Sequence, residues 1–372
     1  MHLNSLPYYF EDVLKVDEVK RLSGIRFHGT LSFFKKNNNF SSRLEHSIKV
    51  AEFAYHISDK HNFNNDITDA FILSALLHDI GHLPFSHILE PLYRSSSLNY
   101  HEGVTSLIIR RLIAKNEQIR KIFNDKVLSI CLSLFNHSNE YSVLENLLFG
   151  FLSLDTIEGI DRACKPLDKE ELTYDPLKIV DNIIIDGNNI LISNEAISEV
   201  LKFRDVKKNL YNNYISSEKA ISLSAMIIKA SQISLSDKKL IKDLPKLNDF
   251  QIQDMMLENE FSREIIGMIV NKNLFEKLPQ NIDELETSNE NTLTAYVNEF
   301  EYRFNENKID SLQYCFNSKF SENFFLLSDI VPFLKYSRIF KEEPTIYIPS
   351  NTKSSMSFDI EKLKAQDRFT WW

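Results

Sequence analysis

The stretch "SALLHDIGHLPFSH", residues 74–87, decides the fold, because an apolar run ends there in three histidines and an aspartate. The whole chain has only ten histidines in 372 residues. The preceding segment "DITDAFILSALL" is apolar nearly all round, which predicts a central, buried helix. Gly81 and Pro84 should end this helix and leave His78 and Asp79 in its last turn.

Helices are expected on both sides of this segment. Ser42 and Glu45 fit a capping box that opens a helix over residues 43–60, and Asp66 should cap the central helix. A third helix begins near "HEGVTSLIIRRLI". A fourth is expected to run without a break through "YSVLENLLFGFLSLDTIEGIDRA".

Polar residues lie on the buried stripes of these helices. His46, His101 and Asp155 each face inward, next to His78 and Asp79. A lone inward histidine is usually a core residue, but a buried carboxylate costs several kcal/mol unless it is paired or bound to metal. Imidazoles and carboxylates together form the mixed shell that borderline divalent cations prefer. The pattern therefore favours a metal site.

Composition excludes several classes of protein. Hydrophobic residues make up 43% and charged residues 26% of the chain, as in a soluble globular protein. The net charge of −9 disfavours nucleic acid as a partner of the whole surface, although a local basic cleft stays possible. No signal peptide, membrane span or glycine-rich phosphate loop is found, and three scattered cysteines suit a reducing compartment. We expect a cytoplasmic protein that does not bind membranes.

The expected fold is mainly α. A helical domain over residues 1–235 should contain a small β-hairpin in "NIIIDGNNILIS", and residues 236–372 should form a C-terminal α or α+β region of unknown role. The lysine-rich passage "SLSDKKLIKDLPKLND" is typical of a linker, and "EEPTIYIPS" of a strand.

The motifs resemble those of a known family. "RLEHS" at residues 43–47, "HDIGHLPFSH" at residues 78–87 and "HE" at residues 101–102 are similar to the HD-domain metal-dependent phosphohydrolases, above all the deoxynucleoside triphosphate triphosphohydrolase branch. The resemblance covers roughly residues 10–230. It implies an HD-domain helical bundle and one divalent metal ion, with Mn, Fe, Mg, Zn or Ni all possible. The implied ligands are His46, His78, Asp79 and Asp155.

The resemblance also implies catalytic roles. His87 and Glu90, three residues apart, match a histidine–carboxylate dyad that transfers protons during attack at the α-phosphate. A surface or capping pair is the alternative for these two residues. His82 and His101 match histidines that face the phosphate.

Substrate contacts are implied at three further positions. Arg43 matches a phosphate-contacting arginine, and Lys207 and Tyr211 in "RDVKKNLYNNY" resemble the family helix that holds the triphosphate. A solvated charged surface is the alternative explanation for these residues.

The departures from the family lie in the substrate pocket. Where the family reads Asp-x-x-Asp-Tyr, this chain has Glu158 and Gly159, so we expect open space beside the sugar. Where the family has a glutamine near the sugar and base, this chain has Phe27, which can stack or fill a pocket but forms no hydrogen bonds.

The predicted function is hydrolysis of a nucleotide, with a (deoxy)nucleoside triphosphate as the substrate and metal-activated water attacking phosphorus. Two alternatives stay open. One is a non-catalytic nucleotide sensor or nucleic-acid-binding regulator, and the other is a phosphodiesterase or phosphatase for another phosphorylated metabolite. A cyclic-dinucleotide phosphodiesterase or an alarmone hydrolase is disfavoured, because the Gly-Tyr-Pro and Glu-Asp signatures are missing. A homo-oligomer is expected.

Overall fold

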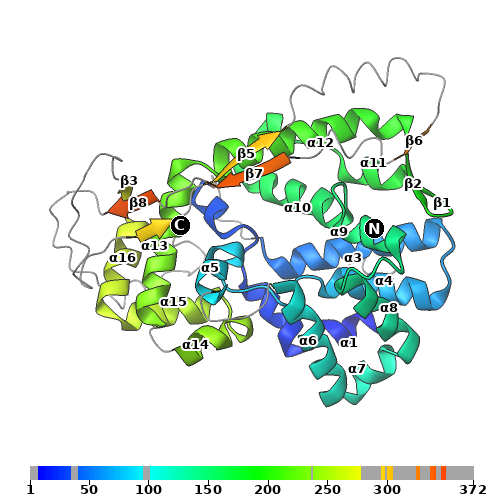
Figure 1. The fold of residues 1–372 in the computed structure, drawn as a ribbon, viewed down its shortest axis with the longest axis horizontal. Coiled ribbons are helices and arrows are strands. Elements are labelled where there is room, and N and C mark those ends of the chain that lie inside the picture. The colour runs from blue at the N-terminus through cyan, green and yellow to red at the C-terminus, as the bar shows by residue number, and fades with distance from the viewer. Residues whose placement is uncertain are drawn as a thin grey trace.

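The computed structural model describes residues 7–34, 41–94, 101–235 and 238–277, and the strands between residues 295 and 348. Helices dominate the described residues, which confirms the mainly α class (Figure 1). Besides the helices that are described one by one below, the helical segments of the structure are α1 (Phe10–Leu14), α2 (Asp17–Lys20), η2 (Arg21–Gly24), η3 (Gly29–Phe34), η4 (Ser86–Leu89), α5 (Glu90–Arg94), α6 (His101–Lys115), α7 (Glu117–Ile122), α8 (Asp125–Phe135), η5 (Lys165–Leu167), η6 (Glu170–Leu172), α11 (Pro176–Asp181), η7 (Asn194–Ala196), α12 (Ile197–Leu210) and η8 (Tyr211–Ile215).

The helix α3 (Arg43–Lys60) begins with the predicted capping box. Glu45 N donates to Ser42 Oγ at 3.2 Å, and Ser42 N donates to Glu45 Oε2 at 2.7 Å. This reciprocal pair satisfies two backbone donors that have no partner within the helix. It fixes the point from which Arg43 and the residues after it enter the core.

The helix α4 (Asn65–Leu77) packs along α3 and is buried from Ala70 to its end. Its predicted cap was wrong. Asn64 is the N-cap, because it has the extended backbone that a cap requires and its side chain accepts from Ile67 N at 3.1 Å. Asp66 is already helical and lies instead 3.0 Å from Lys126 Nζ.

The predicted fourth helix is two helices, α9 (Ser142–Phe149) and α10 (Leu154–Cys164). Gly150 ends the first in an extended conformation, and Ser153 caps the second by accepting from Thr156 N at 3.1 Å. Phe151 would continue the apolar face of one long helix, but it lies in the connection between the two helices and is 41% exposed. The break places Asp155 in the first turn of α10.

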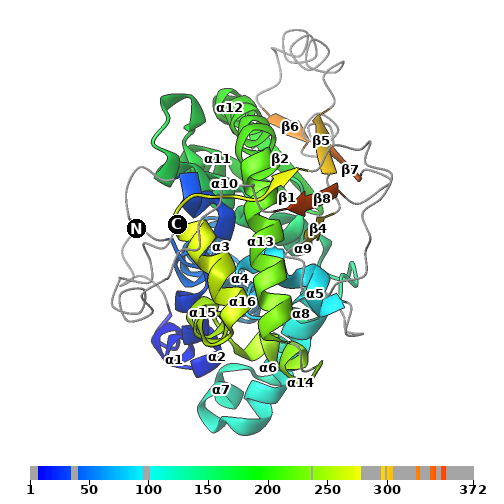
Figure 2. The same cartoon turned by 90° about the vertical axis from the view of Figure 1, so that its left-hand side faces the viewer.

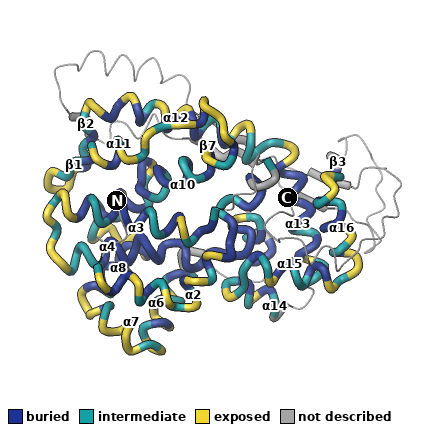
Figure 3. The backbone as a smooth tube through the Cα atoms, turned by 180° about the vertical axis from the view of Figure 1, so that it is seen from behind, coloured by how far each residue is buried: buried dark blue, intermediate teal, exposed yellow. Residues whose placement is uncertain are grey.

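Figure 3 shows buried backbone concentrated along α3, α4 and α8, where the larger hydrophobic core lies. A second core is formed by α13 (Glu218–Ser234), α15 (Asp249–Glu258) and α16 (Glu260–Val270), which Figure 2 shows bundled together. The loop after α4 joins this second core through Leu83, Phe85 and Leu89. The C-terminal helices therefore support a loop that carries predicted site residues.

The predicted lysine-rich linker is helical, with α14 (Lys238–Asp243) followed by η9 (Leu244–Lys246). Ile241 and Leu244 are buried in the second core, and this burial outweighs the polar composition. The predicted domain boundary at residue 235 stays a prediction.

The predicted hairpin is present as β1 (Ile183–Asp186) and β2 (Asn189–Ser193), with Gly187 in the left-handed region at φ +58°. A third strand, β6 (Phe324–Leu326), pairs with β2. Two further small sheets make the C-terminal region α+β. They contain β5 (Phe300–Phe304) with β7 (Tyr336–Phe340), and β3 (Glu276–Lys277) and β4 (Ala295–Val297) on either side of β8 (Thr345–Ile348). In the described part of the chain, no helix is both long and apolar enough to span a membrane.

Candidate metal centre and substrate pocket

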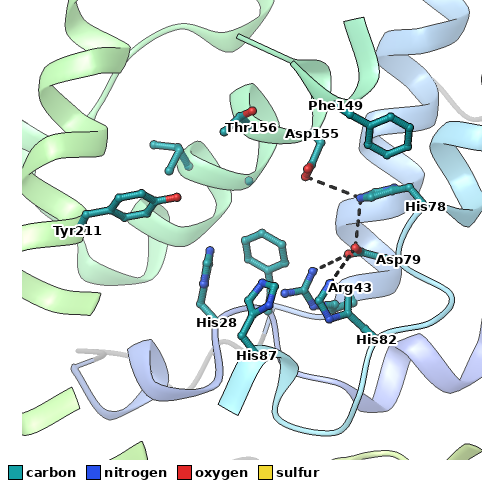
Figure 4. Close-up of a pocket in the computed structure, with 13 residues that line it drawn as sticks. His28, Arg43, His78, Asp79, His82, His87, Phe149, Asp155, Thr156 and Tyr211 are labelled. Atoms are coloured by element: carbon teal, nitrogen blue, oxygen red, sulfur yellow. Dashed lines mark hydrogen bonds and ion pairs between the residues drawn. The ribbon is translucent and has the colours of Figure 1, made fainter. Parts of the chain in front are cut away.

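Three helices bring the predicted metal ligands together. His46 lies one turn into α3, His78 is the C-terminal cap of α4 with Asp79 directly after it, and Asp155 lies in the first turn of α10. Figure 4 shows Asp155, His78 and Asp79 in a row at one wall of a pocket. The end of α4 thus places His78 and Asp79, and the break between α9 and α10 places Asp155, in the same cluster of side chains.

The distances within this group suit one cation. His46 Nε2 lies 3.0 Å from Asp155 Oδ1 and 3.2 Å from His78 Nε2. His78 Nε2 lies 3.3 Å from Asp79 Oδ1 and 3.7 Å from Asp155 Oδ1. Atoms bonded to one ion at ~2.0–2.2 Å lie roughly 3–4 Å apart. His46, His78 and Asp79 fit this best, because their ligand atoms all lie within 4.8 Å of one another, and Asp155 Oδ1 keeps the same spacing to the two histidines. Two imidazoles and two carboxylates are also the donor set that a borderline divalent ion prefers.

The electrostatics of the group show what a cation would relieve. Burial lowers the pKa of His46, but the nearby carboxylates of Glu158, Asp155 and Asp79 outweigh burial and raise the pKa to about 9. Burial raises the pKa of Asp155, whereas hydrogen bonds with His46 and His78 lower it well below the usual range. The carboxylates are therefore ionised and the imidazole of His46 carries the proton. A divalent cation can take the place of that positive charge.

A buried carboxylate orients His46 from behind. Glu158 Oε2 contacts His46 Nδ1, and Arg162 Nε donates to Glu158 Oε1 at 2.8 Å. Arg162 also donates through Nη1 to Ser41 Oγ at 2.9 Å. A carboxylate on one ring nitrogen fixes the tautomer and leaves Nε2 available for a metal. Sequence reasoning noted Glu158 only as a departure from the family pattern, although its i+3 spacing from Asp155 was a usable signal.

The predicted dyad is in contact. His87 Nδ1 lies 2.7 Å from Glu90 Oε1, as the three-residue spacing predicts. The ring of His82 is buried, with its centroid 4.9 Å from that of His87, and its Nε2 lies 3.1 Å from Asp79 Oδ1. The dyad thus adjoins the metal group through His82. His101 begins α6, but its side chain lies outside the described residues.

Arg43 is buried at the edge of the metal group. Its Nη1 donates to Asp79 Oδ2 at 2.7 Å and its Nε to Ser86 Oγ at 2.8 Å. Ser86 in turn donates to Arg26 O at 2.7 Å. The surface-charge reading of Arg43 is therefore wrong: this guanidinium lines the pocket and is held at two points.

The pocket encloses a cavity of about 170 Å³ beside these residues. Its other described walls are Phe27, His28, Phe149, Thr156, Gly159, Ile160 and Tyr211. Sequence reasoning missed His28, Phe149, Thr156 and Ile160, because the pattern of apolar residues does not show which helix faces a cavity.

Phe27 takes up part of the space beside Gly159. A methyl group added there would lie 3.1 Å from Phe27 Cζ, and the Phe27 ring lies 4.6 Å from that of His46. An aromatic ring from the segment before η3 thus takes part of the volume that a side chain on α10 would use, while Gly159 and Phe27 both line the cavity. The expectation of open space beside a sugar stays a prediction.

Of the two residues on the segment predicted to hold a triphosphate, Tyr211 lines the cavity and Lys207 does not. Tyr211 lines the pocket from η8. Lys207, buried on α12, lies with its Nζ 5.7 Å from the ring centroids of both Phe203 and Tyr211. Burial lowers the pKa of Lys207 to about 8, although Asp155 raises it. Lys207 is not among the described residues that line the cavity.

This geometry agrees with the comparison to known families, in which residues 43–183 match the HD domain. This segment is an HD domain. It includes α3, α4 and α10 and therefore all four predicted metal ligands.

Two curated relatives extend the comparison. A putative HD domain-containing protein of Acanthamoeba polyphaga mimivirus is 24% identical over 72% of this chain and 63% of its own length. A deoxyguanosinetriphosphate triphosphohydrolase-like protein of Pelagibacter ubique is 26% identical over 52% of each chain. This chain therefore spans less than two thirds of these curated relatives.

The fold extends beyond the HD domain. The crystal structure of a phosphohydrolase from Bacteroides thetaiotaomicron superposes with a TM-score of 0.69 at 15% identity, over 93% of this chain and 96% of that one. A hypothetical protein from Aquifex aeolicus gives 0.67 at 16% identity, over 92% and 93%. Nearly the whole chain thus shares one known architecture.

Proposed function

We propose that this protein is a metal-dependent phosphohydrolase that acts on a nucleotide, with (deoxy)nucleoside triphosphates as the foremost substrates. The observation that carries the proposal is the cluster of His46, His78 and Asp79, whose ligand atoms all lie within 4.8 Å of one another. Asp155 lies against both imidazoles, and a histidine–carboxylate pair lies beside the cluster. The relatives named as triphosphohydrolase-like and phosphohydrolase support it.

The proposed ligands of the metal are His46, His78, Asp79 and Asp155. A divalent ion bound there would polarise a phosphate oxygen and lower the pKa of water. Glu158 holds His46 in the ligand tautomer, and His82 together with Arg43 holds Asp79.

Proton transfer is assigned to the pair formed by His87 and Glu90. Glu90 lies within hydrogen-bond distance of Nδ1 and favours the tautomer that carries its proton there, which puts the basic lone pair of the ring on Nε2. As water oxygen attacks phosphorus and the bond to the ester oxygen breaks, this imidazole can carry a proton between the two oxygens. Arg43, which lines the cavity, supplies positive charge for the phosphate oxygens. His101 is proposed to face the phosphate, as the family resemblance implies.

The test is turnover of a nucleotide panel by protein loaded with Mn²⁺, Mg²⁺ or Fe²⁺. The panel contains the eight common ribo- and deoxyribonucleoside triphosphates, and released tripolyphosphate, pyrophosphate and phosphate are separated by ion chromatography. We expect Asp79→Ala to lose metal and at least ~10³-fold of the rate, and His87→Gln to keep metal but lose about 10²–10⁴-fold.

A matched control uses another aspartate–histidine contact, which lies outside the pocket. His56 Nε2 lies 2.6 Å from Asp181 Oδ1, so Asp181→Ala removes the same kind of pair and should leave the rate unchanged. Turnover without metal, or full activity of Asp79→Ala, would refute the proposal. Nucleotide binding without turnover under every metal would favour the non-catalytic sensor instead.

A smaller phosphorylated substrate is the second candidate. The cavity of about 170 Å³ is below the range of ~300–1,000 Å³ for drug-sized ligands. Among the described residues that line it, Arg43 is the one side chain with a permanent positive charge. Mononucleotides and sugar phosphates therefore belong in the panel, and a preference for them over triphosphates would establish a phosphatase or phosphodiesterase.

A further inference from the structure

His28 has a constrained backbone at the mouth of the pocket. Its φ is +51°, a left-handed conformation that histidine adopts more readily than most non-glycine residues. The backbone is fixed on both sides, because Phe27 N donates to Ser41 O at 2.8 Å and Leu31 N donates to His28 O at 2.9 Å. Gly29 packs against the backbone of Phe85, where an added methyl group would lie 3.5 Å from the carbonyl oxygen. The imidazole is thus presented from a rigid support.

The ring of His28 has nothing to bind within the described protein. Figure 4 shows it directed into the space that Tyr211 and His87 also face, and all three line the cavity. Its contact there is with the Phe27 ring, at a centroid distance of 4.7 Å, and neither ring nitrogen has a hydrogen-bond partner among the described residues. The side chain is partly exposed, and the cavity that it lines is where its ring nitrogens can meet a ligand.

The chemistry of this imidazole selects the ligand group. Burial, together with the charges of Arg43, His87 and His46, lowers the pKa of His28 to about 3, so the ring is neutral. A neutral imidazole offers one donor and one acceptor. A hydroxyl group also donates and accepts, whereas a phosphate oxygen only accepts and is better matched by Arg43.

The position of the ring agrees with this choice. The Phe27 ring lies between the two histidines, 4.7 Å from His28 and 4.6 Å from the ligand ring of His46. If a phosphate ester lies at the metal group, the sugar on its ester oxygen is the next part of the substrate. That sugar would then lie about the width of the Phe27 ring away from His46. Phe27 would pack against that sugar while His28 reaches its hydroxyl.

We propose that His28 is a specificity-determining residue that hydrogen-bonds a sugar hydroxyl of the phosphorylated substrate. This inference rests on the proposed function, since it assumes that a phosphate ester lies at the metal group. It assigns the recognition of the sugar to a residue outside the metal-binding motifs.

The test compares His28→Gly, His28→Asn and the wild type. Glycine removes the imidazole without strain at φ +51°, whereas asparagine tolerates this backbone and keeps a donor and an acceptor. Asn62→Gly is the matched control, because Asn62 has φ +52° on the exposed connection between α3 and α4. Thermal unfolding checks that each variant is folded.

Two probes separate the sugar from the phosphate chain. The first is kcat/KM for the eight nucleoside triphosphates, and the second is the inhibition constant of tripolyphosphate, which has no sugar. We expect His28→Gly to lower kcat/KM about 10-fold or more for at least one nucleotide, to change the tripolyphosphate constant less than about twofold, and His28→Asn to recover most of the loss.

Several results would overturn the proposal. An equal loss for nucleotide and tripolyphosphate would mean that His28 acts on the phosphate or on the fold. No loss in either probe, or an asparagine variant as weak as the glycine variant, would exclude the hydrogen bond. If the wild type turns over no nucleotide, the proposed function fails. The dissociation constants of the nucleotides and of tripolyphosphate are then measured by calorimetry, because no ligand is consumed. Equal affinity of the wild type for nucleotides and tripolyphosphate would refute the role of His28.

Discussion

Phe27 and Gly159 share one volume although 132 positions separate them in the sequence. The Phe27 ring is wedged among His46, Arg43 and the α10 backbone, with the Arg43 guanidinium 5.0 Å from its centroid. Each residue taken alone looks like the loss of a family side chain. Together they are an exchange, in which the aromatic group comes from another segment.

We predict that these two positions are energetically coupled. In Gly159→Ala the new methyl group would lie 3.1 Å from Phe27 Cζ, so the ring must shift and kcat/KM should fall. Phe27→Leu leaves room, so the double variant should be less impaired than the two single effects predict, by about 0.5–3 kcal/mol. A double-mutant cycle on kcat/KM measures this, with Phe27→Leu and Gly187→Asn as a pair that should be additive. Additive effects at positions 27 and 159 would contradict the shared volume.

The proton on His46 makes a pH-dependent prediction. In the metal-free protein the pKa of His46 is about 9, so the ring is protonated at neutral pH, whereas a metal needs the lone pair of Nε2. Affinity for Mn²⁺ should therefore rise with pH, by up to ~10-fold per unit below pH 9. Calorimetry in buffers of different ionisation enthalpy should also record proton release.

Glu158→Gln is the informative variant for this prediction. It removes the charge that raises the His46 pKa most, so the pH dependence should become shallower above neutral pH. Loss of the orienting carboxylate should lower affinity about 10–100-fold. A pH-independent affinity in the wild type would contradict the assignment of His46 as a ligand.

Among the elements, the ends of the helices place the site. The capping box of α3 is readable from Ser42 and Glu45, because that hydrogen-bond pattern is local. The break between α9 and α10 was missed, since Leu144, Leu148 and Phe151 continue a helical period across it. Gly150 ends α9 and Ser153 caps α10. These two local signals outweigh the helical spacing of the apolar residues.

We predict that Gly150→Ala destabilises the protein and disturbs the metal group. A methyl group at this position would lie 2.4 Å from the backbone oxygen of Asn146, so the backbone must move. The expected cost is about 1–3 kcal/mol of unfolding free energy, with weaker metal binding because Asp155 begins the next helix. Urea unfolding and Mn²⁺ titration measure both effects. Gly187→Asn, with open space and a left-handed φ, should change stability by less than about 0.5 kcal/mol.

At the scale of the whole molecule, the second core supports the loop that carries His82 and His87. Asp249, fully buried at the start of α15, accepts from Phe85 N at 2.6 Å and from Arg26 N at 3.0 Å. Phe85 and the following serine both have left-handed backbones, with φ of +56° and +58°. A C-terminal helix therefore holds a strained turn of the site.

Removing this carboxylate should affect stability and activity together. Asp249→Ala removes a buried carboxylate that lies 3.7 Å from the Arg26 guanidinium and accepts two backbone N–H groups, so we expect a loss of about 3–5 kcal/mol of unfolding free energy. Glu258→Ala on the exposed face of α15 should stay within about 0.5 kcal/mol. Urea unfolding followed by activity at a permissive temperature tests this. An unchanged unfolding free energy would show that α15 does not support the loop.

Homo-oligomer formation and a cytoplasmic location stay predictions, and nucleic acid stays a possible partner that the sequence does not indicate. The oligomeric state bears on the site only if a second copy reaches the pocket, which gel filtration with light scattering and a mixed-variant activity assay would reveal.

The sequence by itself determined the helical class and the hairpin, because short-range hydrogen bonding and turn chemistry are local properties of the chain. Through its resemblance to the HD family it also indicated the four proposed metal ligands. Only the tertiary structure decided that Phe27 occupies part of the space beside Gly159, that His28 faces the cavity and that Asp249 supports the loop. Those relations join residues far apart in the chain, and the close packing of a protein interior, rather than any local pattern, determines which of them meet.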